Sequence, residues 1–167
     1  MTSIKRYILY DHIYFVTSVT FNRNSILCDN SDLFWLSMKY TNERINFENL
    51  AWVILPDHFH LLIDVRKNNI SEIMRIFKQK FSGLYRSKFN LKSGRLWQNR
   101  FWDHIIRDET DFNNHIDYIH YNPVKHKLTN NPFKYKLSSI NDWRDKGLYE
   151  ANWGVFEEKE FAGEFGE

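Results

Sequence analysis

The 167-residue chain is predicted to form an α+β domain built on a four-stranded antiparallel sheet. Runs rich in β-branched and aromatic residues alternate with runs in which apolar residues recur every three or four positions. Their order is β-α-β-β-α-β, followed by one more helix. This is the ferredoxin-like split βαβ arrangement, in which two helices cover one face of the sheet. The other face is then free for a ligand and for the last helix.

The first half of the chain supplies three strands and one helix. β-Branched and aromatic residues fill His12–Phe21, while Leu50–Leu55 and His58–Val65 are mainly apolar. A Pro-Asp turn separates the last two runs, so they are expected to form a hairpin. Between the first two strands, Asp29–Arg44 begins with polar cap residues and has apolar residues at helical spacing.

The second half supplies a long amphipathic helix, a strand and a final helix. Ser71 is the expected N-cap of the first helix, which continues to Phe89. Leu96–Arg107 is expected to be the fourth strand. The final helix, Asp108–Asn122, has acidic residues in its first turn and is expected to end before Pro123.

We expect one main domain over residues 1–130 and an extension over residues 131–167. The extension has a short amphipathic segment at Ser138–Lys146 and an acidic end that is expected to fray. A single cysteine, Cys28, excludes an internal disulfide. No apolar run is long enough to span a bilayer, and Asp11 and His12 interrupt the apolar residues that a signal peptide would need. A cytoplasmic location is therefore expected.

Charge is distributed unevenly along the chain. The net charge is only +2, but Arg66–Arg107 contains eleven Lys or Arg and two acidic residues, a net +9, whereas Asp142–Glu167 has a net charge of −5. Aromatic residues make up 17% of the chain and are interleaved with the basic ones. This combination favours a polyanion whose bases can stack. A charged helix face that contacts only water is the alternative, and charge alone does not decide between the two.

Two histidines lie two residues apart in the predicted third strand. Because side chains alternate along a strand, His58 and His60 are expected side by side on the face away from the helices. Two neutral imidazoles at a fixed separation suit a divalent metal. An isolated pair of this kind is more often half-exposed and without a ligand, so other residues must decide.

The final helix adds a phenol and an amide. Tyr118 and Asn122 are four residues apart and so share one helical face, beside the apolar stripe. Asn122 would offer a neutral oxygen ligand, and Tyr118 a nucleophile toward a phosphodiester, since tyrosine forms covalent intermediates. Tyr121 competes as nucleophile but does not share the face of Asn122. A tyrosine that only packs at the edge of the core is the alternative.

Three other polar residues near these positions have less defined roles. Asp57 is either a turn residue or an acceptor that orients an imidazole. His115 and His120 are expected to pack or to lie at the surface, because their spacing does not demand a ligand.

Three stretches resemble the single-tyrosine transposases with an HUH motif (His, bulky hydrophobic residue, His), and among them the REP-associated tyrosine transposases. They are residues 55–62 (LPDHFHLL), 96–107 (LWQNRFWDHIIR) and 118–125 (YIHYNPVK). Each is weak alone, but three in the same order and spacing are specific. One position departs: Phe15 stands where relatives often have histidine, and His12 or His104 is a candidate to replace it.

The resemblance implies action on single-stranded DNA next to hairpins, with a divalent metal, usually Mg²⁺ or Mn²⁺. By position, His58 and His60 match the metal ligands, and Asn122 matches the polar residue that completes the metal site. Tyr118 matches the nucleophile, which in the family attacks a DNA phosphate, keeps a 5′-phosphotyrosine and releases a 3′-hydroxyl.

The basic stretch supplies the expected DNA contacts. Its Lys and Arg side chains would contact phosphates, and its aromatic side chains would stack on bases. The expected set is Lys78, Lys80, Arg86, Lys88, Lys92, Arg95, Trp97 and Arg100, with Phe101 and Trp102 as further stacking candidates.

The predicted function is a metal-dependent single-stranded DNA endonuclease and strand transferase, that is, a transposase. It would be a monomer or a homodimer and would associate with the nucleoid through DNA. Two alternatives are a hairpin-DNA-binding protein that does not cleave, and a metal phosphodiesterase that uses water in place of tyrosine. The presence of the two histidines together with Tyr118 and Asn122 argues against a pure binding protein.

Overall fold

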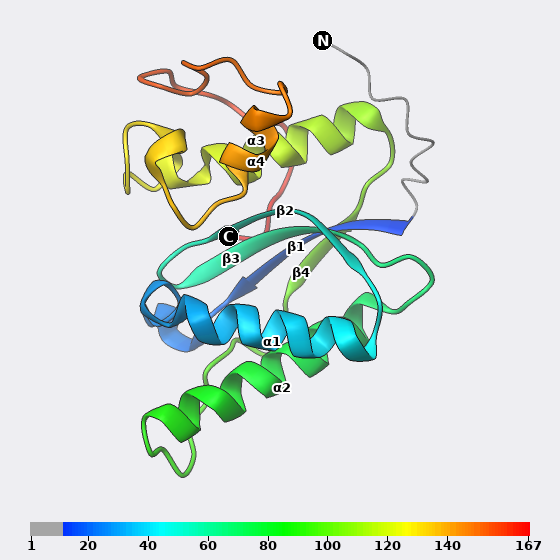
Figure 1. The fold of residues 1–167 in the computed structure, drawn as a ribbon, viewed down its shortest axis with the longest axis vertical. Helices are drawn as coiled ribbons and strands as arrows, with labels where there is room; N and C mark the ends of the chain where they lie inside the picture. Colours follow the sequence, from blue (N-terminus) through cyan, green and yellow to red (C-terminus); the bar gives the residue numbers. More distant parts are fainter. Residues whose placement is uncertain (1–11) are drawn as a thin grey trace.

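The computed structural model describes residues 12–167 and has a four-stranded antiparallel sheet at its centre (Figure 1). Its strands are β1 (Ile13–Val19), β2 (Glu48–Ile54), β3 (His58–Asp64) and β4 (Trp102–Ile105), in the order β2-β3-β1-β4. The predicted α+β arrangement is confirmed. The domain predicted over residues 1–130 begins outside the described residues. Asp11, which argues against a signal peptide, also lies outside them.

Helices cover both faces of this sheet. α1 (Ser31–Arg44) and α2 (Ile70–Lys88) pack on one face, while α3 (Glu109–Lys125) and the short α4 (Ile140–Asp145) lie on the other (Figure 1). The connections contain three 3-10 turns, η2 (Phe21–Arg23), η3 (Cys28–Asn30) and η4 (Pro132–Lys134). No helix within residues 12–167 has the length and apolar character needed to cross a membrane.

β3 is buried on both faces because a separate apolar cluster lies on each side of the sheet. Phe59, Leu61 and Ile63 belong to the cluster under α1 and α2. Leu62, on the opposite face, belongs to the cluster under α3. His58 and His60 share that second face, as the alternation predicts, but their exposed fractions are only 2% and 0%. The face that was expected to be free is therefore covered by a second layer, and the histidines are buried.

The helix caps show how α2 and α3 begin. The side chain of Asn69 accepts a hydrogen bond from the Ser71 backbone N–H (2.8 Å), so the cap of α2 lies two residues before the predicted Ser71. Asp108 caps α3 by accepting from the backbone N–H of Asp111 (2.9 Å). α3 continues through Pro123 to Lys125, contrary to the prediction, with the proline in its last turn, where it removes one backbone hydrogen bond from the helix.

The predicted fourth strand is much shorter than Leu96–Arg107. Only β4 pairs with β1, and Trp97 forms an isolated bridge with Thr20 instead. The indole of Trp97 enters the cluster under α2, which takes this part of the chain away from a regular ladder.

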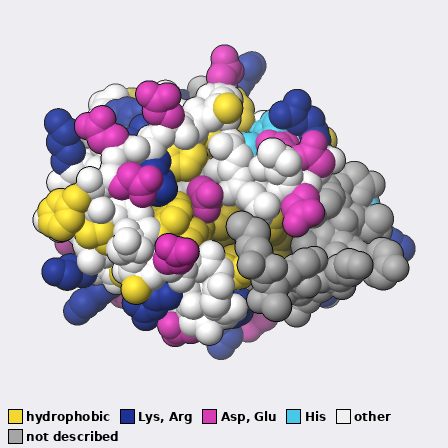
Figure 2. Space-filling model, turned by 90° about the horizontal axis from the view of Figure 1, so that it is seen from above, with side chains coloured by type: hydrophobic (Ala, Val, Ile, Leu, Met, Phe, Trp, Pro, Cys, Tyr) yellow, Lys and Arg dark blue, Asp and Glu magenta, His cyan; other side chains and the backbone are white. Residues whose placement is uncertain are grey.

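The acidic C-terminal segment is packed rather than frayed, so that prediction is wrong as well. It passes between α3 and the sheet (Figure 1), and Phe165 is buried there. Gly166 has a positive φ of 73°, and a Cβ at this position would overlap the side chain of Trp102. Figure 2 views the molecule from the α3 side: acidic side chains are spread over this face, with apolar side chains exposed between them.

Candidate active site

His58 and His60 form the floor of a polar site between β3 and α3. Their ring centroids are 5.1 Å apart, and the rings are nearly perpendicular. Burial lowers the pKa of His60 to about 4, so its imidazole is neutral near pH 7. A neutral imidazole keeps one nitrogen lone pair for a cation.

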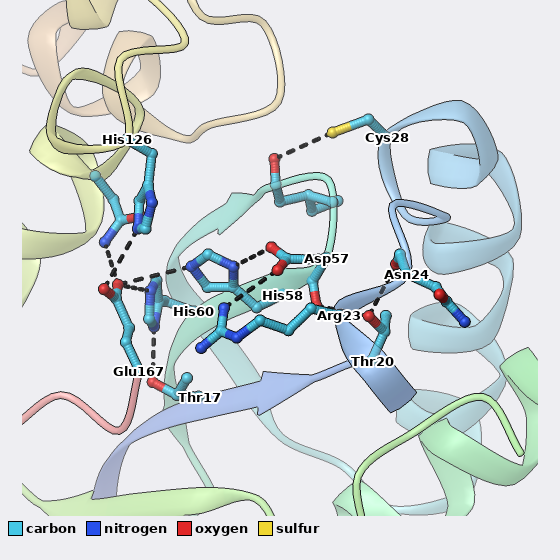
Figure 3. A network of polar contacts seen from close by, with 12 residues as sticks. Thr17, Thr20, Arg23, Asn24, Cys28, Asp57, His58, His60, His126 and Glu167 are labelled. Atoms are coloured by element: carbon cyan, nitrogen blue, oxygen red, sulfur yellow. Dashed lines mark hydrogen bonds and ion pairs between the residues drawn. The ribbon is translucent and has the colours of Figure 1, made fainter.

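A hydrogen-bond acceptor lies against the Nδ1 atom of each imidazole (Figure 3). The Nδ1 of His58 is 2.6 Å from Oδ1 of Asp57. The Nδ1 of His60 is 2.7 Å from the Thr17 hydroxyl, which itself donates to the carbonyl of Phe165 (2.5 Å) and so accepts from the ring. Both rings therefore carry their proton on Nδ1 and direct Nε2 toward the same space.

Asp57 is an ionised acceptor in this arrangement. Partial burial raises its pKa, but hydrogen bonds and charges from His58 and Arg23 outweigh that effect and hold the pKa below the usual value. The Arg23 guanidinium is 3.1 Å from the Oδ2 of Asp57 (Figure 3). Of the two roles considered for Asp57, the geometry favours orienting an imidazole.

α3 brings Tyr118 and Asn122 to the same space, as their spacing predicts. The Tyr118 ring lies 5.3 Å from that of His60, and the Tyr118 hydroxyl donates to the Glu167 carboxylate. Asn122 donates to the same carboxylate oxygen through Nδ2 (2.9 Å). The hydroxyl of Tyr121 donates instead to the carbonyl of Glu157 (2.7 Å) and does not join the group.

The carboxylate of Glu167 occupies the centre of the site (Figure 3). Its Oε1 is 2.9 Å from Nε2 of His60 and 3.6 Å from Nε2 of His58. Its Oε2 is 2.6 Å from Nζ of Lys125 and 3.3 Å from Nε2 of His126. Burial raises the pKa of Glu167, but its polar contacts with the surrounding histidines outweigh burial and lower the pKa well below the usual range. The site therefore holds an anion.

The residues present fit a divalent metal ion. The ligand atoms of His58, His60 and Glu167 all lie within 4.8 Å of one another. Nε2 of His58 and Oδ1 of Asn122 are buried and have no hydrogen-bond partner among the described residues. Nε2 of His60 and the carboxylate oxygen beside it are both acceptors when Nδ1 carries the proton, so a cation between them would relieve their repulsion. Nitrogen and oxygen donors of this kind are common metal ligands.

The Tyr118 side chain is buried, and its hydroxyl lies next to the negatively charged carboxylate of Glu167. Burial, followed by the Glu167 carboxylate, raises the pKa of its phenol above the usual value of 10.0. The Phe165 ring stacks on it with centroids 3.7 Å apart, and the ammonium of Lys125 donates to its oxygen (2.8 Å). The phenol is therefore neutral at rest, and a positive charge is already beside the oxygen.

A second histidine group lies one strand away. His104 is paired across the sheet with Phe15, and its Nε2 is 2.8 Å from Oδ2 of Asp111, which also contacts His115. Phe15 separates this group from His60, because its ring packs against both His60 and His115. His104 therefore does not take the place of the histidine that the family resemblance leads us to expect at position 15.

The basic residues expected to contact DNA lie on α2 and the loop that follows it. α2 covers the opposite face of the sheet from Tyr118 (Figure 1). Lys92 and Arg100 are exposed. Most of the others have contacts with the protein: Lys78 with the rings of Trp97 and Phe101, Lys80 with the ring of Tyr40, Arg86 with the Gly94 carbonyl, Lys88 with Asn30, and Arg95 with the Trp97 carbonyl.

Trp97 is part of the core rather than of the surface. Its exposed fraction is 6%, and its ring packs against Phe59, Phe77 and Phe81. In this structure the ring has no free face for a base, which conflicts with its expected stacking role.

Sequence reasoning assigned no role to Lys125, His126, Thr17 or Glu167. Lys125 stands seven residues after Tyr118, two helical turns along the same face, and this spacing is the signal that could have identified it. Glu167 comes from a segment whose sequence only indicates a solvated acidic end, so no local pattern predicts its place.

Comparison with known proteins agrees with this geometry. The family model described as "Transposase IS200 like" matches residues 7–122. The chain therefore belongs to the IS200-like transposases. The predicted resemblance to the REP-associated tyrosine transposases is confirmed by curated relatives. A Haemophilus influenzae protein of this type is 34% identical, covering 92% of this chain and 94% of the relative, and the REP-associated tyrosine transposase of Escherichia coli K12 is 32% identical, covering 92% and 91%.

Solved structures show the same relationship. A REP-associated tyrosine transposase bound to a REP hairpin has a TM-score of 0.76 and 28% identity, covering 99% of this chain and 93% of that one. A structure from Deinococcus radiodurans, with a TM-score of 0.50 and 21% identity, covers 66% of this chain and 91% of that one and shares the fold.

Proposed function

We propose that this transposase cleaves and rejoins single-stranded DNA through a covalent bond between Tyr118 and a DNA phosphate. The observation that carries the proposal is the convergence of the Tyr118 hydroxyl, the Nε2 atoms of His58 and His60, and Asn122 on one carboxylate. A carboxylate and a phosphodiester are both oxyanions, and either can accept hydrogen bonds from Tyr118 and Asn122 or bind a cation that the two imidazoles hold. The same groups can therefore hold a DNA phosphate.

A divalent cation, Mg²⁺ or Mn²⁺, would be held by His58, His60 and Asn122. When bound, it would polarise a phosphoryl oxygen and stabilise the charge that gathers there. Asp57 and Thr17 keep the two imidazoles in the tautomer that leaves Nε2 available.

The phenol of Tyr118 would act as the nucleophile. Its oxygen forms a bond to phosphorus while the bond to the 3′-oxygen breaks, so the protein keeps the 5′-phosphate and the DNA strand ends in a 3′-hydroxyl. Rejoining is the reverse of this step. Glu167 must leave before DNA enters, because its carboxylate occupies the place of the phosphate.

A DNA hairpin is the partner that the comparisons favour. The structural relative with the TM-score of 0.76 is bound to a REP hairpin. We propose that the exposed basic side chains of α2 and the following loop contact the phosphates of such a hairpin, with single-stranded DNA at Tyr118. Location on the bacterial nucleoid would follow from this binding.

The test is to incubate the full chain with single-stranded hairpin DNA from beside its own gene, with Mn²⁺ or Mg²⁺. A covalent protein–DNA adduct on a denaturing gel is the expected result. Tyr118→Phe removes only the attacking oxygen and should abolish the adduct while hairpin binding persists. The matched control, Tyr121→Phe, should keep it. Cleavage without an adduct would favour the water-dependent phosphodiesterase, and binding without cleavage would favour the hairpin-binding protein.

A further inference from the structure

We infer that Lys125 is a catalytic residue of this site, which binds the attacking oxygen of Tyr118 and the reacting phosphate at the same time. The inference rests on the proposed function and adds Lys125 to the residues that would take part in the reaction. Lys125 is the last residue of α3, two turns after Tyr118. Its Nζ donates to the Tyr118 hydroxyl oxygen (2.8 Å) and lies 2.6 Å from Oε2 of Glu167.

The two oxygens of the Glu167 carboxylate divide the site into two halves. Oε1 is contacted by His60, Asn122 and Tyr118, whereas Oε2 is contacted by Lys125 and His126. A phosphodiester likewise has two non-bridging oxygens. With a phosphate in place of the carboxylate, one oxygen faces the proposed metal ligands and the other faces the Lys125 ammonium.

The position of Lys125 suits the charge that develops during attack. Tyr118 loses its phenolic proton to water, and an electron pair of its oxygen forms the bond to phosphorus. The bond from phosphorus to the 3′-oxygen breaks, and that oxygen takes a proton from water. Lys125 stays protonated throughout. Its ammonium stabilises both the phenolate as it forms and the added charge on the non-bridging oxygen.

Lys125 is well placed for this role because its side chain contacts the buried Tyr118 ring and is also partly exposed to solvent. The ammonium lies 4.7 Å from the centroid of the Tyr118 ring, while 41% of the side chain is exposed. A phosphate arriving from solvent therefore meets Lys125 on its way to the buried histidines.

The test compares Lys125→Met and Lys125→Arg with the full chain under single-turnover conditions. Lys127→Met is the matched control, because Lys127 is an exposed lysine just beyond the same helix. We expect Lys125→Met to slow adduct formation by roughly 10²-fold, the loss typical of one transition-state donor. Rejoining from the preformed adduct should slow by the same factor. Lys125→Arg should restore most of the rate, and Lys127→Met should change neither rate.

A second readout does not depend on cleavage. Hairpin binding by Tyr118→Phe, measured in chelator over a range of salt, gives the number of phosphate contacts from its salt slope. Adding Lys125→Met should lower the slope by about 0.7, the value for one contact with single-stranded DNA. An unchanged slope, or a Lys125→Met rate equal to that of Lys127→Met, would overturn the inference. Absence of any adduct from the unmodified chain would instead overturn the proposed function, and the salt slope would still decide on Lys125.

Discussion

The His58 imidazole has one nitrogen against Asp57 and the other open toward the site. A carboxylate in this position fixes the ring and makes its free nitrogen a better donor to a cation. Asp57→Asn keeps an acceptor at the same place but removes the charge. We expect the affinity for Mn²⁺, measured by titration calorimetry, to fall roughly 10- to 100-fold.

Arg23→Gln is the control for this prediction, because it removes the other charged partner of Asp57 and leaves the contact with His58 intact. It should change the affinity little. If the unmodified chain bound no divalent cation, the metal ligand role of the two histidines would be wrong.

At the scale of single residues, the sequence predicts the members of the site better than their surroundings. Alternation along β3 and the four-residue spacing on α3 place His58, His60, Tyr118 and Asn122 together. Nothing local predicts the burial of the histidines, because it depends on a second layer that packs on that face of the sheet. Glu167 lies over a hundred residues from His60 in sequence, and such a contact has no periodic signature.

α3 is held in place by a buried histidine as well as by apolar contacts. His120 has Nδ1 2.8 Å from the Tyr149 hydroxyl and Nε2 2.8 Å from the Ser139 hydroxyl, so it joins α3 to the segment around α4. Burial lowers the pKa of His120 from 6.5 to about 3. The folded chain keeps this ring neutral where the unfolded chain would protonate it.

The pH dependence of stability follows from that difference. Between about pH 6.5 and pH 3 the unfolded state binds the extra proton, so the free energy of unfolding falls as the pH falls, by about 1.4 kcal/mol per pH unit for a single such group. We expect His120→Gln to be less stable than the unmodified chain at pH 7 but to lose less further stability at pH 5. Urea unfolding at the two pH values measures this, and parallel losses would contradict the assignment to His120.

Element types are well predicted here, and element ends are not. The order of strands and helices can be predicted from periodicity, because an element that is buried on one or both faces has apolar residues at a characteristic spacing. The ends depend on individual contacts: Asn69 rather than Ser71 caps α2, and the Trp97 ring leaves the fourth strand for the core. Pro123 shows the same limit, because α3 continues past it to Lys125 although a proline inside a helix removes one backbone hydrogen bond.

The basic stretch and the acidic C-terminal segment lie on opposite sides of the sheet. The basic residues of α2 and the following loop are on one side of the sheet, and the acidic segment that ends at Glu167 packs on the other. If the basic side contacts the DNA backbone, hairpin affinity should fall steeply with salt. Lys92→Glu together with Arg100→Glu should weaken binding to all hairpins alike and lower the salt slope by about 0.7 to 0.9 per lost contact.

Lys134→Glu together with Lys136→Glu supplies the control, since this double variant makes the same charge change at exposed sites outside the basic stretch. Unchanged affinity and slope in the double variant of Lys92 and Arg100 would mean that this helix face and loop are only solvated. A loss confined to one hairpin sequence would indicate base readout in place of backbone contact.

In the proposed mechanism the C-terminal segment competes with DNA for the groups that surround Glu167. Glu167→Gln removes the charge that Lys125 and His126 contact, and one charge-assisted hydrogen bond contributes about 1.5–3 kcal/mol. We expect this variant to form the covalent adduct roughly 10- to 100-fold faster at limiting DNA. A slower reaction would show that Glu167 serves the chemistry and does not merely occupy the site.

The residue at position 166 affects how firmly the C-terminal segment is held in the site. The residue is not among the donors around Glu167, yet the segment can lie in its present position only because nothing larger than hydrogen is attached to its Cα beside Trp102. Gly166→Ala should loosen the segment and speed adduct formation as Glu167→Gln does, with every donor left in place. Every substitution at position 166 adds a Cβ against Trp102, so single changes there should all act in the same direction and release the segment, without altering the residues proposed to perform the cut.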